Sequence, residues 1–449
     1  MMASHTTLEN KLIEFVELVE VKQTNQNPRP KIQKVPEHLR NRKQFEKQYS
    51  PKFVSIGPIH HHNPNLKLGE NYKLTWAAKY IQTTQQNPQL LHKKIAEKID
   101  ELKGLYANDV LADTGESLKG FDTLDEKMSW MLFVDGCFLL FILMFVDGQV
   151  DRSKHPDIKY DQLVLVMKDV LLLENQLPYL LLKLLWKDDN EYELIDTMKN
   201  FFIYPVKRTW RRPENLLNEP VTPTHLLDLQ REIMLLTKSN SKVEGNNEEY
   251  NIDISWKCSE EKSKVMTYRN IQSLNTVGII AKSSGTRRLK DVDFSKQGLW
   301  VWKLTLPEIV VDDTTSASLL NLTAYEMCSD FENDYGICSF VVFMHSLIDH
   351  PEDVEILRSN GILVNLLGSN EEVANLFNTI STDLVFNPET YYEVKAKIHE
   401  CYNVYRIWMT LLSNTLFNGD PWSILTLIIT LYALLFTVIQ TWFTIYPRH

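Results

Sequence analysis

Three consecutive histidines, His60, His61 and His62, form the densest group of potential metal ligands in the chain. Two histidines two positions apart on a strand face the same side, and imidazole nitrogens bind transition metals. A metal site also needs further ligands and supporting contacts, and no Cys/His partner motif lies nearby in the sequence. Alternatively, Gly57 and Pro58 make a turn, and the imidazoles cap backbone groups or pair with acids. We adopt this structural interpretation and expect no bound metal or cofactor.

Two carboxylates stand alone in apolar surroundings: Asp135 in MLFVDGCFLL (131–140) and Glu174 in LLLENQLPYLLL (171–182). A buried charge needs a partner, whereas a carboxylate with a perturbed pKa can serve as a general acid or base. We interpret both residues as members of buried ion pairs or capping networks. Arg40 and the three histidines are the candidate partners.

The residues after Glu174 resemble a helix start. Asn175 or Gln176 can accept backbone N–H groups there, and Pro178 can open the next helix. Cys137 lies between large apolar residues, which predicts a buried and unreactive thiol, because a reactive thiol needs access and a lowered pKa. We therefore expect these positions to be structural.

Helical spacing of apolar residues dominates the chain from residue 31 to about 235. Short β-branched or alternating runs, broken by turn residues, predict a small antiparallel sheet across 276–313. The expected fold class is mainly α (α+β). Helices are expected at residues 71–86, 89–106, 124–146, 160–174, 178–185, 223–237, 316–328, 337–349, 351–360, 370–382 and 388–416.

Three segments flank or interrupt the expected globular body of residues 31–416. Residues 1–30 read as a short amphipathic helix followed by a linker. Residues 238–263 are polar and rich in Asn, Ser and Glu, which predicts a mobile insertion. Residues 421–446 are expected to form a transmembrane anchor.

The anchor prediction rests on the stretch from Pro421 to Pro447, which contains no charged residue. About 20 apolar residues are needed to cross the hydrocarbon core of a bilayer. Trp422 lies at one end and Trp442 and Tyr446 at the other, and aromatic rings favour the membrane–water interfaces. A buried C-terminal core helix is the alternative, but the stretch lacks the polar stripe that such a helix usually carries.

A second membrane span is possible at 128–146, where Asp135 is the single charge. A central aspartate costs about 2.5–3.5 kcal/mol on insertion scales, and Gly136 weakens the segment further. We therefore favour a central helix of the soluble core for this segment and keep a second span as the alternative.

Composition excludes several other classes of protein. The 449 residues carry a formal net charge of −10, so the chain lacks a basic footprint for nucleic acid. Five scattered cysteines without a CxxC pair suit a reducing compartment. The N-terminus lacks the features of a signal peptide. We expect a single-pass protein of the plasma membrane or an endomembrane, with a cytosolic body. An N-glycosylation sequon at Asn321 would matter only if the body faced outward.

Several segments together resemble the plant domain-of-unknown-function 247 family, from about residue 31 to the C-terminus. They are KVPEHLR (34–40), SPKFVSIGPIHHH (50–62), MLFVDGCFLL (131–140), LLLENQLPYLLL (171–182), THLLDL (224–229), LPEIVVDDTT (306–315), NLTAYE (321–326) and DPW (420–422). The chain departs from the family pattern at Ile59 and His62 of the histidine motif and at Phe141, where an acidic residue is common.

The resemblance implies a mostly helical body, a C-terminal membrane helix, a plant origin and no established enzymatic activity. Some grass members look like pollen-side determinants of self-incompatibility, which hints at recognition. Our first hypothesis is a membrane-anchored interaction, recognition or signalling protein with a protein partner. The alternative is a hydrolase or transferase that uses His60–His62 with Asp135 or Glu174, although GxSxG, HExxH and GxxxxGK[ST] motifs are absent.

Overall fold

The computed structural model describes residues 30–42, 45–61, 63–115, 118, 120–203, 222–236, 270–297, 301–332, 334–417 and 421–445. The amphipathic helix expected near the N-terminus, the polar insertion at 238–263 and His62 lie outside these residues. The described chain is mostly helical with two small sheets, so the mainly α expectation is confirmed.

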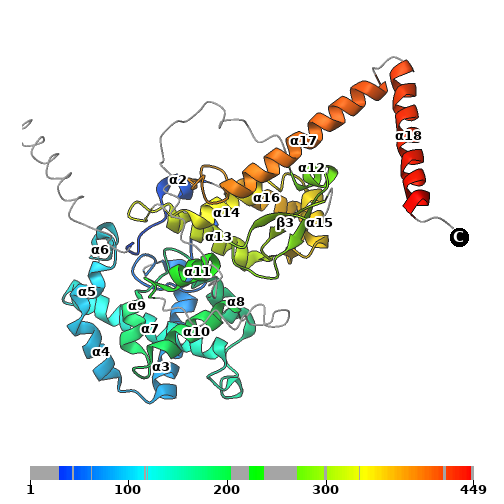
Figure 1. The fold of residues 1–449 in the computed structure, drawn as a ribbon. Coiled ribbons are helices and arrows are strands. Elements are labelled where there is room, and N and C mark those ends of the chain that lie inside the picture. The colour runs from blue at the N-terminus through cyan, green and yellow to red at the C-terminus, as the bar shows by residue number, and fades with distance from the viewer. Residues whose placement is uncertain are drawn as a thin grey trace, which may run out of the picture.

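Helices alone build the first half of the described chain, which Figure 1 draws in blue to green. They include three short 3-10 helices, η1 to η3. The elements are α2 (Glu37–Arg40), η1 (Glu46–Gln48), η2 (Pro64–Leu66), α3 (Lys67–Thr84), α4 (Pro88–Glu97), α5 (Ile99–Gly104), α6 (Asn108–Gly115), α7 (Leu124–Asp147), η3 (Arg152–Lys154), α8 (Tyr160–Asp169), α9 (Tyr179–Leu185), α10 (Glu191–Ile203) and α11 (Leu226–Leu235).

Helix α7 is the centre of this half. Thr123 caps its first turn, and Gly148 ends it in the left-handed conformation. Its apolar side chains are buried nearly all round, with α3, α4, α9 and α10 packed against it. Among the described residues, α7 is the helix that is long and apolar enough to cross a membrane, yet it lies inside this core. The expectation of a core helix at 128–146 is therefore preferred over a second span.

A glycine allows close packing at the middle of α7. A Cβ atom on Gly136 would lie 2.4 Å from the Leu185 side chain and 3.5 Å from that of Leu181. Real Cβ atoms do not approach so closely, so a larger residue here would force the Leu185 side chain of α9 to move. The same glycine that weakened the segment as a membrane span is thus explained by packing in the core.

The second half contains the five strands of the described chain and is drawn in lime to red in Figure 1. Its own core of apolar side chains also includes residues of the N-terminal segment, such as Val35 and Leu39. The elements are α12 (Ile271–Thr276), β1 (Ile279–Ser283), β2 (Asp293–Lys296), β3 (Trp302–Leu306), β4 (Ile309–Val311), α13 (Asp313–Glu326), α14 (Gly336–His345), α15 (Pro351–Ser359), β5 (Leu363–Asn365), α16 (Asn370–Ile380), α17 (Tyr392–Phe417) and α18 (Pro421–Ile445).

The prediction of one antiparallel sheet across 276–313 is wrong in its topology. β3 lies between its two neighbours, pairing parallel with β1 and antiparallel with β2. β4 leaves this sheet and pairs parallel with β5, a strand that the sequence analysis did not anticipate. Alternation of apolar residues marks a strand but carries no information about the direction of its neighbour. Pro307, which cannot donate to a ladder, separates β3 from β4.

Two predicted helices end earlier than expected. The pattern at 160–174 continues past Asp169, where α8 ends, and the pattern at 89–106 is divided at Lys98 into α4 and α5. In the first case the apolar residues after α8 are buried in turns instead of a helix. Burial alone therefore does not determine helix length.

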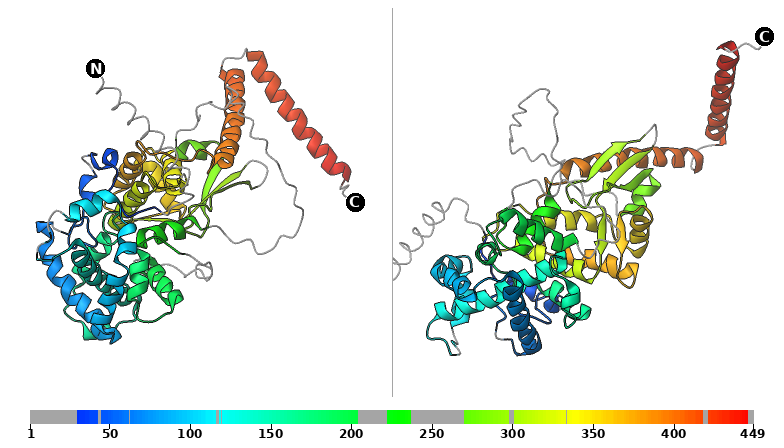
Figure 2. Two further views of the ribbon diagram at one scale, coloured as in Figure 1. Left: turned by 90° about the vertical axis from the view of Figure 1, so that its left-hand side faces the viewer. Right: turned by 90° about the horizontal axis from the view of Figure 1, so that it is seen from below.

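The last two helices leave the body. α17 projects outward from the second half, and α18 stands apart from the body in all three views (Figures 1 and 2). The expected C-terminal element is thus a helix, and its described apolar side chains are exposed. The apolar stretch described within it, Ile428–Trp442, is shorter than a full span, so its membrane location stays a prediction.

Candidate functional site

Buried polar residues hold the N-terminal segment against the rest of the body, and the first of them, Asp169, was not singled out in the sequence. Asp169, the last residue of α8, accepts backbone N–H groups from Lys52 (2.9 Å), Phe53 (2.7 Å) and Val54 (2.8 Å). Burial raises the pKa of the Asp169 carboxyl, against the effect of these three hydrogen bonds. The carboxylate fixes the path of residues 52–54 across the helical half.

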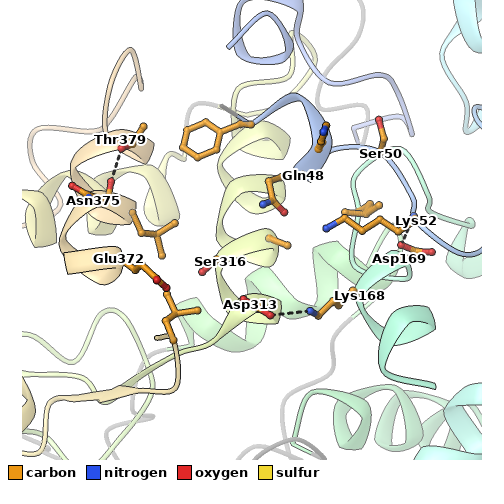
Figure 3. A pocket seen from close by; sticks show the side chains of 16 residues that line it. Gln48, Ser50, Lys52, Lys168, Asp169, Asp313, Ser316, Glu372, Asn375 and Thr379 are labelled. Carbon is orange, nitrogen blue, oxygen red and sulfur yellow. Dashed lines mark hydrogen bonds and ion pairs between the residues drawn. The ribbon is translucent and has the colours of Figure 1, made fainter. Parts of the chain in front are cut away.

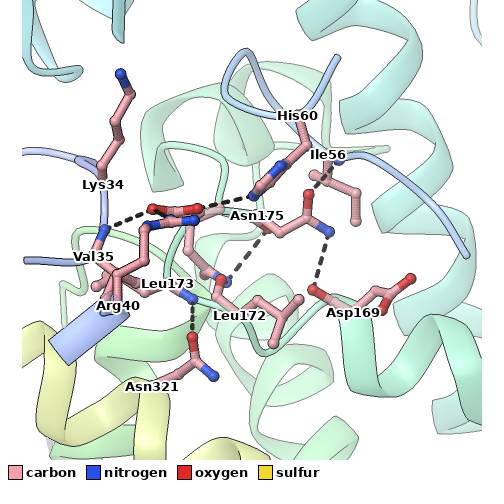
Figure 4. Close-up of polar contacts among 12 residues, drawn as sticks. Lys34, Val35, Arg40, Ile56, His60, Asp169, Leu172, Leu173, Asn175 and Asn321 are labelled. Carbon is pink, nitrogen blue, oxygen red and sulfur yellow. Dashed lines mark hydrogen bonds and ion pairs between the residues drawn. The ribbon is translucent and has the colours of Figure 1, made fainter. Parts of the chain in front are cut away.

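Glu174 joins three further groups, and its side chain is fully buried. It accepts the backbone N–H of Val35 at 2.7 Å, a hydrogen bond from the Arg40 guanidinium, and one from His60 Nε2 at 2.9 Å (Figure 4). Burial would raise the pKa of Glu174, but the hydrogen bonds from His60 and Arg40 outweigh it and hold that pKa below its ordinary value. Glu174 is therefore paired with partners that its sequence context suggested.

Asn175 bonds to a neighbouring segment and does not cap the helix that follows it. Its Oδ1 accepts the N–H of Ile56 at 2.7 Å, and its Nδ2 donates to the carbonyls of Val54 (3.1 Å) and Asp169 (3.0 Å) (Figure 4). The helix-start interpretation is wrong for this residue, because all its partners lie outside α9. Pro178 immediately precedes α9, at the N-cap position.

Gln176 does accept a backbone N–H group at a helix start, but at the start of another helix. Its Oε1 accepts the N–H of Leu227 in α11 at 3.0 Å. Its Nε2 donates to the carbonyls of Val170 and Leu172 within its own loop, at 2.8 and 2.7 Å. The loop between α8 and α9 thus connects the N-terminal segment to α11.

Asp135 belongs to a separate network inside the helical half. Its Oδ1 lies 2.7 Å from Lys73 Nζ, and its Oδ2 accepts the N–H of Gly57 at 2.8 Å. The Lys73 ammonium also lies 2.7 Å from Glu70 Oε2 and donates to the Ser55 carbonyl at 2.8 Å. Burial raises the pKa of Asp135 to about 6 even though Lys73 opposes the shift. This ammonium therefore joins α3 to α7 and to the N-terminal segment.

Lys73 was missed in the sequence, although a signal existed. Gly69, Lys73, Trp76, Ala77 and Tyr80 are all buried, at the three- and four-residue spacing of one helix face. A lysine at a core position of an amphipathic pattern implies a buried carboxylate elsewhere in the chain. Asp135, already identified as a lone charge, was the obvious partner.

The turn at Gly57 needs a glycine. Its φ is +75°, and a Cβ atom there would lie 2.9 Å from the carbonyl oxygen of Gln176. The turn brings the Gly57 N–H to Asp135 and the following His60 to Glu174. His61 lies partly buried in the same turn. This geometry agrees with the structural interpretation of the Gly-Pro turn.

The structure brings together one of the pairs that the alternative hypothesis names, His60 and Glu174, inside a network that also holds Arg40 and the Val35 N–H. His60 meets Glu174, whereas Asp135 is paired with Lys73, so the residues fall into two networks with internal partners. In the described part of the chain, no group of three or more His, Cys, Asp or Glu residues could hold a metal ion. Burial raises the pKa of the Cys137 thiol to about 12, which leaves it unreactive.

Comparison with known protein families and with curated proteins identifies relatives of this chain. The model of the DUF247 family, described as a plant protein of unknown function, matches residues 32–436. The chain belongs to this family. The UPF0481 protein At3g47200 of Arabidopsis thaliana is 28% identical over 424 residues, covering 88% of this chain and 82% of the relative. The putative UPF0481 protein At3g02645 of the same plant is 22% identical over 425 residues, covering 74% and 75%. No solved structure matches the chain significantly.

A further buried ion pair in this DUF247 protein was also missed in the sequence. Arg231 of α11 lies 2.7 Å from Glu326, whose carboxylate accepts the backbone N–H groups of Ile337 and Cys338, each at 2.9 Å. Glu326 thereby satisfies N–H groups in the first turn of α14, a helix without a side-chain cap from Tyr335 at its own N-cap position. Glu326 ends the motif NLTAYE. Like Glu174, it is a single charge among uncharged residues and could have been recognised in the sequence as needing a partner.

Asn321 of the DUF247 chain is fully buried, so its sequon is not available in the folded protein. Its Oδ1 accepts the N–H of Leu173 at 2.8 Å (Figure 4), and its Nδ2 donates to the carbonyls of Ala317 (2.8 Å) and Gln48 (3.2 Å). A glycan on Nδ2 would displace these contacts. Asn321 therefore cannot report on which side of a membrane the folded body lies.

Proposed function

We propose that this DUF247 protein is a membrane-anchored recognition protein whose helical body binds a protein partner on the cytosolic side. The observation that carries the proposal is α18. Its described large apolar side chains are exposed, for example Leu431 at 60% and Phe436 at 61%, and the sequence from 421 to 447 has no charge. Contiguous exposed apolar surface of this kind marks a membrane or protein interface.

The recognition part of the proposal is supported by the state of the candidate catalytic groups. Glu174, Asp135 and Lys73 use their charges to hold backbone segments together. Groups committed in this way act as scaffold, and scaffold of this kind suits a protein that presents a surface to a partner. The hydrolase or transferase alternative would use the His60–Glu174 pair, but Glu174 is fully buried and is also bonded to Arg40 and to the Val35 N–H.

Removal of residues 421–449 tests the anchor. We expect the truncated protein to leave the membrane fraction and remain in the supernatant, because α18 lies outside both cores. Its melting temperature should match that of the full chain in detergent. Sedimentation after a salt wash, with full-length protein as the control, is the measurement. Continued sedimentation of the truncated protein would contradict the anchor at α18.

The orientation can be tested with a glycosylation site appended after His449. If the body is cytosolic and only the tip of the chain crosses, the appended site should be modified, and glycosidase treatment should increase gel mobility. A matched tag with Gln in place of its acceptor Asn is the control. A tag that stays unmodified while the protein is membrane-bound would contradict the proposed orientation.

A further inference from the structure

A cleft of about 400 Å³ lies between the two halves, a size typical of ligand sites. One wall comes from the N-terminal segment and the end of α8, and the other from α13, α16 and the residues before α16 (Figure 3). Its lining includes the apolar side chains of Phe45 and Leu172, the amides of Gln48 and Asn375, and the ammonium groups of Lys47 and Lys52. Neither the Glu174 network nor the Asp135 network supplies a side chain to this lining, apart from the adjoining Asp169.

The acidic groups of the cleft already have donors. Asp169 accepts three backbone N–H groups, as described above. Asp313 lies 3.3 Å from Lys168 across the cleft, and Glu372 accepts the backbone N–H of Gly368 at 3.2 Å. The carboxylates are thus partly neutralised by the protein itself.

Two further ammonium groups lie on the same wall as Asp169, and that of Lys52 lowers the pKa of the Asp169 carboxyl. Lys47 and Lys52 are exposed, and neither has an ion-pair partner within 4.0 Å in the described part of the chain. The lining holds three lysines and three carboxylates and is formally neutral in a chain of net charge −10, with its positive charge concentrated at Lys47 and Lys52 because Lys168 faces Asp313. This charge favours an anionic group on a ligand.

The rest of the lining suits a peptide. Phe45 and Leu172 are buried and give the cleft apolar surface. The side-chain amides of Gln48 and Asn375 line opposite walls, and each can both donate to and accept from a peptide backbone (Figure 3). Apolar surface, amides on both walls and unpaired cations together match an extended segment with an acidic residue beside an apolar one.

We propose that the cleft binds an acidic–apolar peptide segment of the protein partner, with its carboxylate at Lys47 and Lys52. The inference rests on the recognition role proposed above and names the chemistry of the partner. It does not depend on attachment to a membrane.

The test measures fluorescence anisotropy of labelled eight-residue peptides with full-length protein in detergent. One probe alternates Asp with Leu, and two matched probes carry Asn or Lys in place of Asp. We expect saturable binding of the Asp probe, weaker binding of the Asn probe and weakest binding of the Lys probe. Absence of saturable Asp-probe binding, or equal affinity for all three probes, would overturn the inference.

Charge reversal localises the site. The double variant Lys47→Glu/Lys52→Glu should bind the Asp probe at least about tenfold more weakly than the wild type. It should favour the Lys probe, because rim charges steer binding. Lys154→Glu, an exposed change in η3 outside the cleft, is the matched control and should bind like the wild type. An unchanged probe preference in the double variant would overturn the inference.

A second variant separates occupation of the cleft from general electrostatics. Asn375→Trp fills the cleft from the α16 wall without changing charge, at an exposed position where folding should be preserved. It should weaken binding of the Asp probe as well. If both variants bind a natural partner normally while the probes fail, the recognition role stands and the cleft assignment falls. If a variant binds the probes normally but no longer sediments with membranes, that result concerns the anchor at α18 and not the cleft.

Discussion

Replacement of Glu174 by Ala should lower the free energy of unfolding by about 3–5 kcal/mol, the range for breaking a buried ion pair. The change leaves the Arg40 guanidinium, His60 Nε2 and the Val35 N–H without their shared acceptor. Typical total stabilities are about 5–15 kcal/mol, so the variant should express poorly or unfold at a much lower denaturant concentration. Urea unfolding of full-length protein in detergent, followed by circular dichroism, is the measurement.

The pH dependence of the loss in stability shows whether the ionised carboxylate of Glu174 is its cause. The pKa of Glu174 in the folded protein is held below its ordinary value. The ionised carboxylate therefore stabilises the fold fully at pH values above the ordinary pKa of a glutamate. That contribution is lost as pH falls through the lowered pKa. The difference in stability between wild type and Glu174→Gln should therefore be larger at pH 7 than in acid below the pKa of the folded protein.

A matched control and a contrary outcome complete this test. Glu389→Ala removes an exposed glutamate and should change stability by no more than about 0.5 kcal/mol. A Glu174→Ala protein that unfolds normally but loses a biological activity would move Glu174 from scaffold to functional site. It would also raise the enzyme hypothesis, which needs an available carboxylate.

The two carboxylates could be found in the sequence because a charge within an apolar run has to be compensated. The partners of Glu174 were also foreseeable, since Arg40 and His60 belong to motifs of the same N-terminal segment. The three N–H groups held by Asp169 were not foreseeable, because backbone donors leave no mark in a sequence. These contacts involve residues far apart in the chain.

The same reasoning explains which parts of the fold escaped prediction. The spacing of apolar residues predicted α3, α7 and α16, because each of these helices has one or more faces that are apolar over several turns. The three-residue strand β5 is too short for alternation to be recognised, and its partner β4 lies more than 50 residues before it in the sequence. The cleft has no motif, since its lining combines the N-terminal segment with α8, α13 and α16, which only the fold brings together.

Replacement of Lys73 by Met should cost about 3–5 kcal/mol at pH 8, since it leaves Asp135 buried without its cation. Asp135 would keep the Gly57 N–H, and the Ser55 carbonyl would lose its donor. The methionine fills much of the volume of the lysine stem, so the loss reports mainly on charge. Thermal and urea unfolding of the full chain measure it, with Lys94→Met, an exposed change on α4, as the control.

The loss in Lys73→Met should shrink as the pH is lowered. Burial has already raised the pKa of Asp135 from 3.8 to about 6, and Lys73 opposes that shift. A raised pKa means that the stability linked to the protonated carboxyl is fully present below 3.8 and is lost as pH rises through the value in the folded protein. Without Lys73 that value rises further, so the variant should be closer to wild type at pH 5 than at pH 8. The double variant Lys73→Met/Asp135→Asn should recover part of the loss at pH 8, because neither charge remains buried. A loss that is independent of pH and is not recovered in the double variant would mean that Lys73 acts through packing, and that the ion pair does not hold α3 against α7.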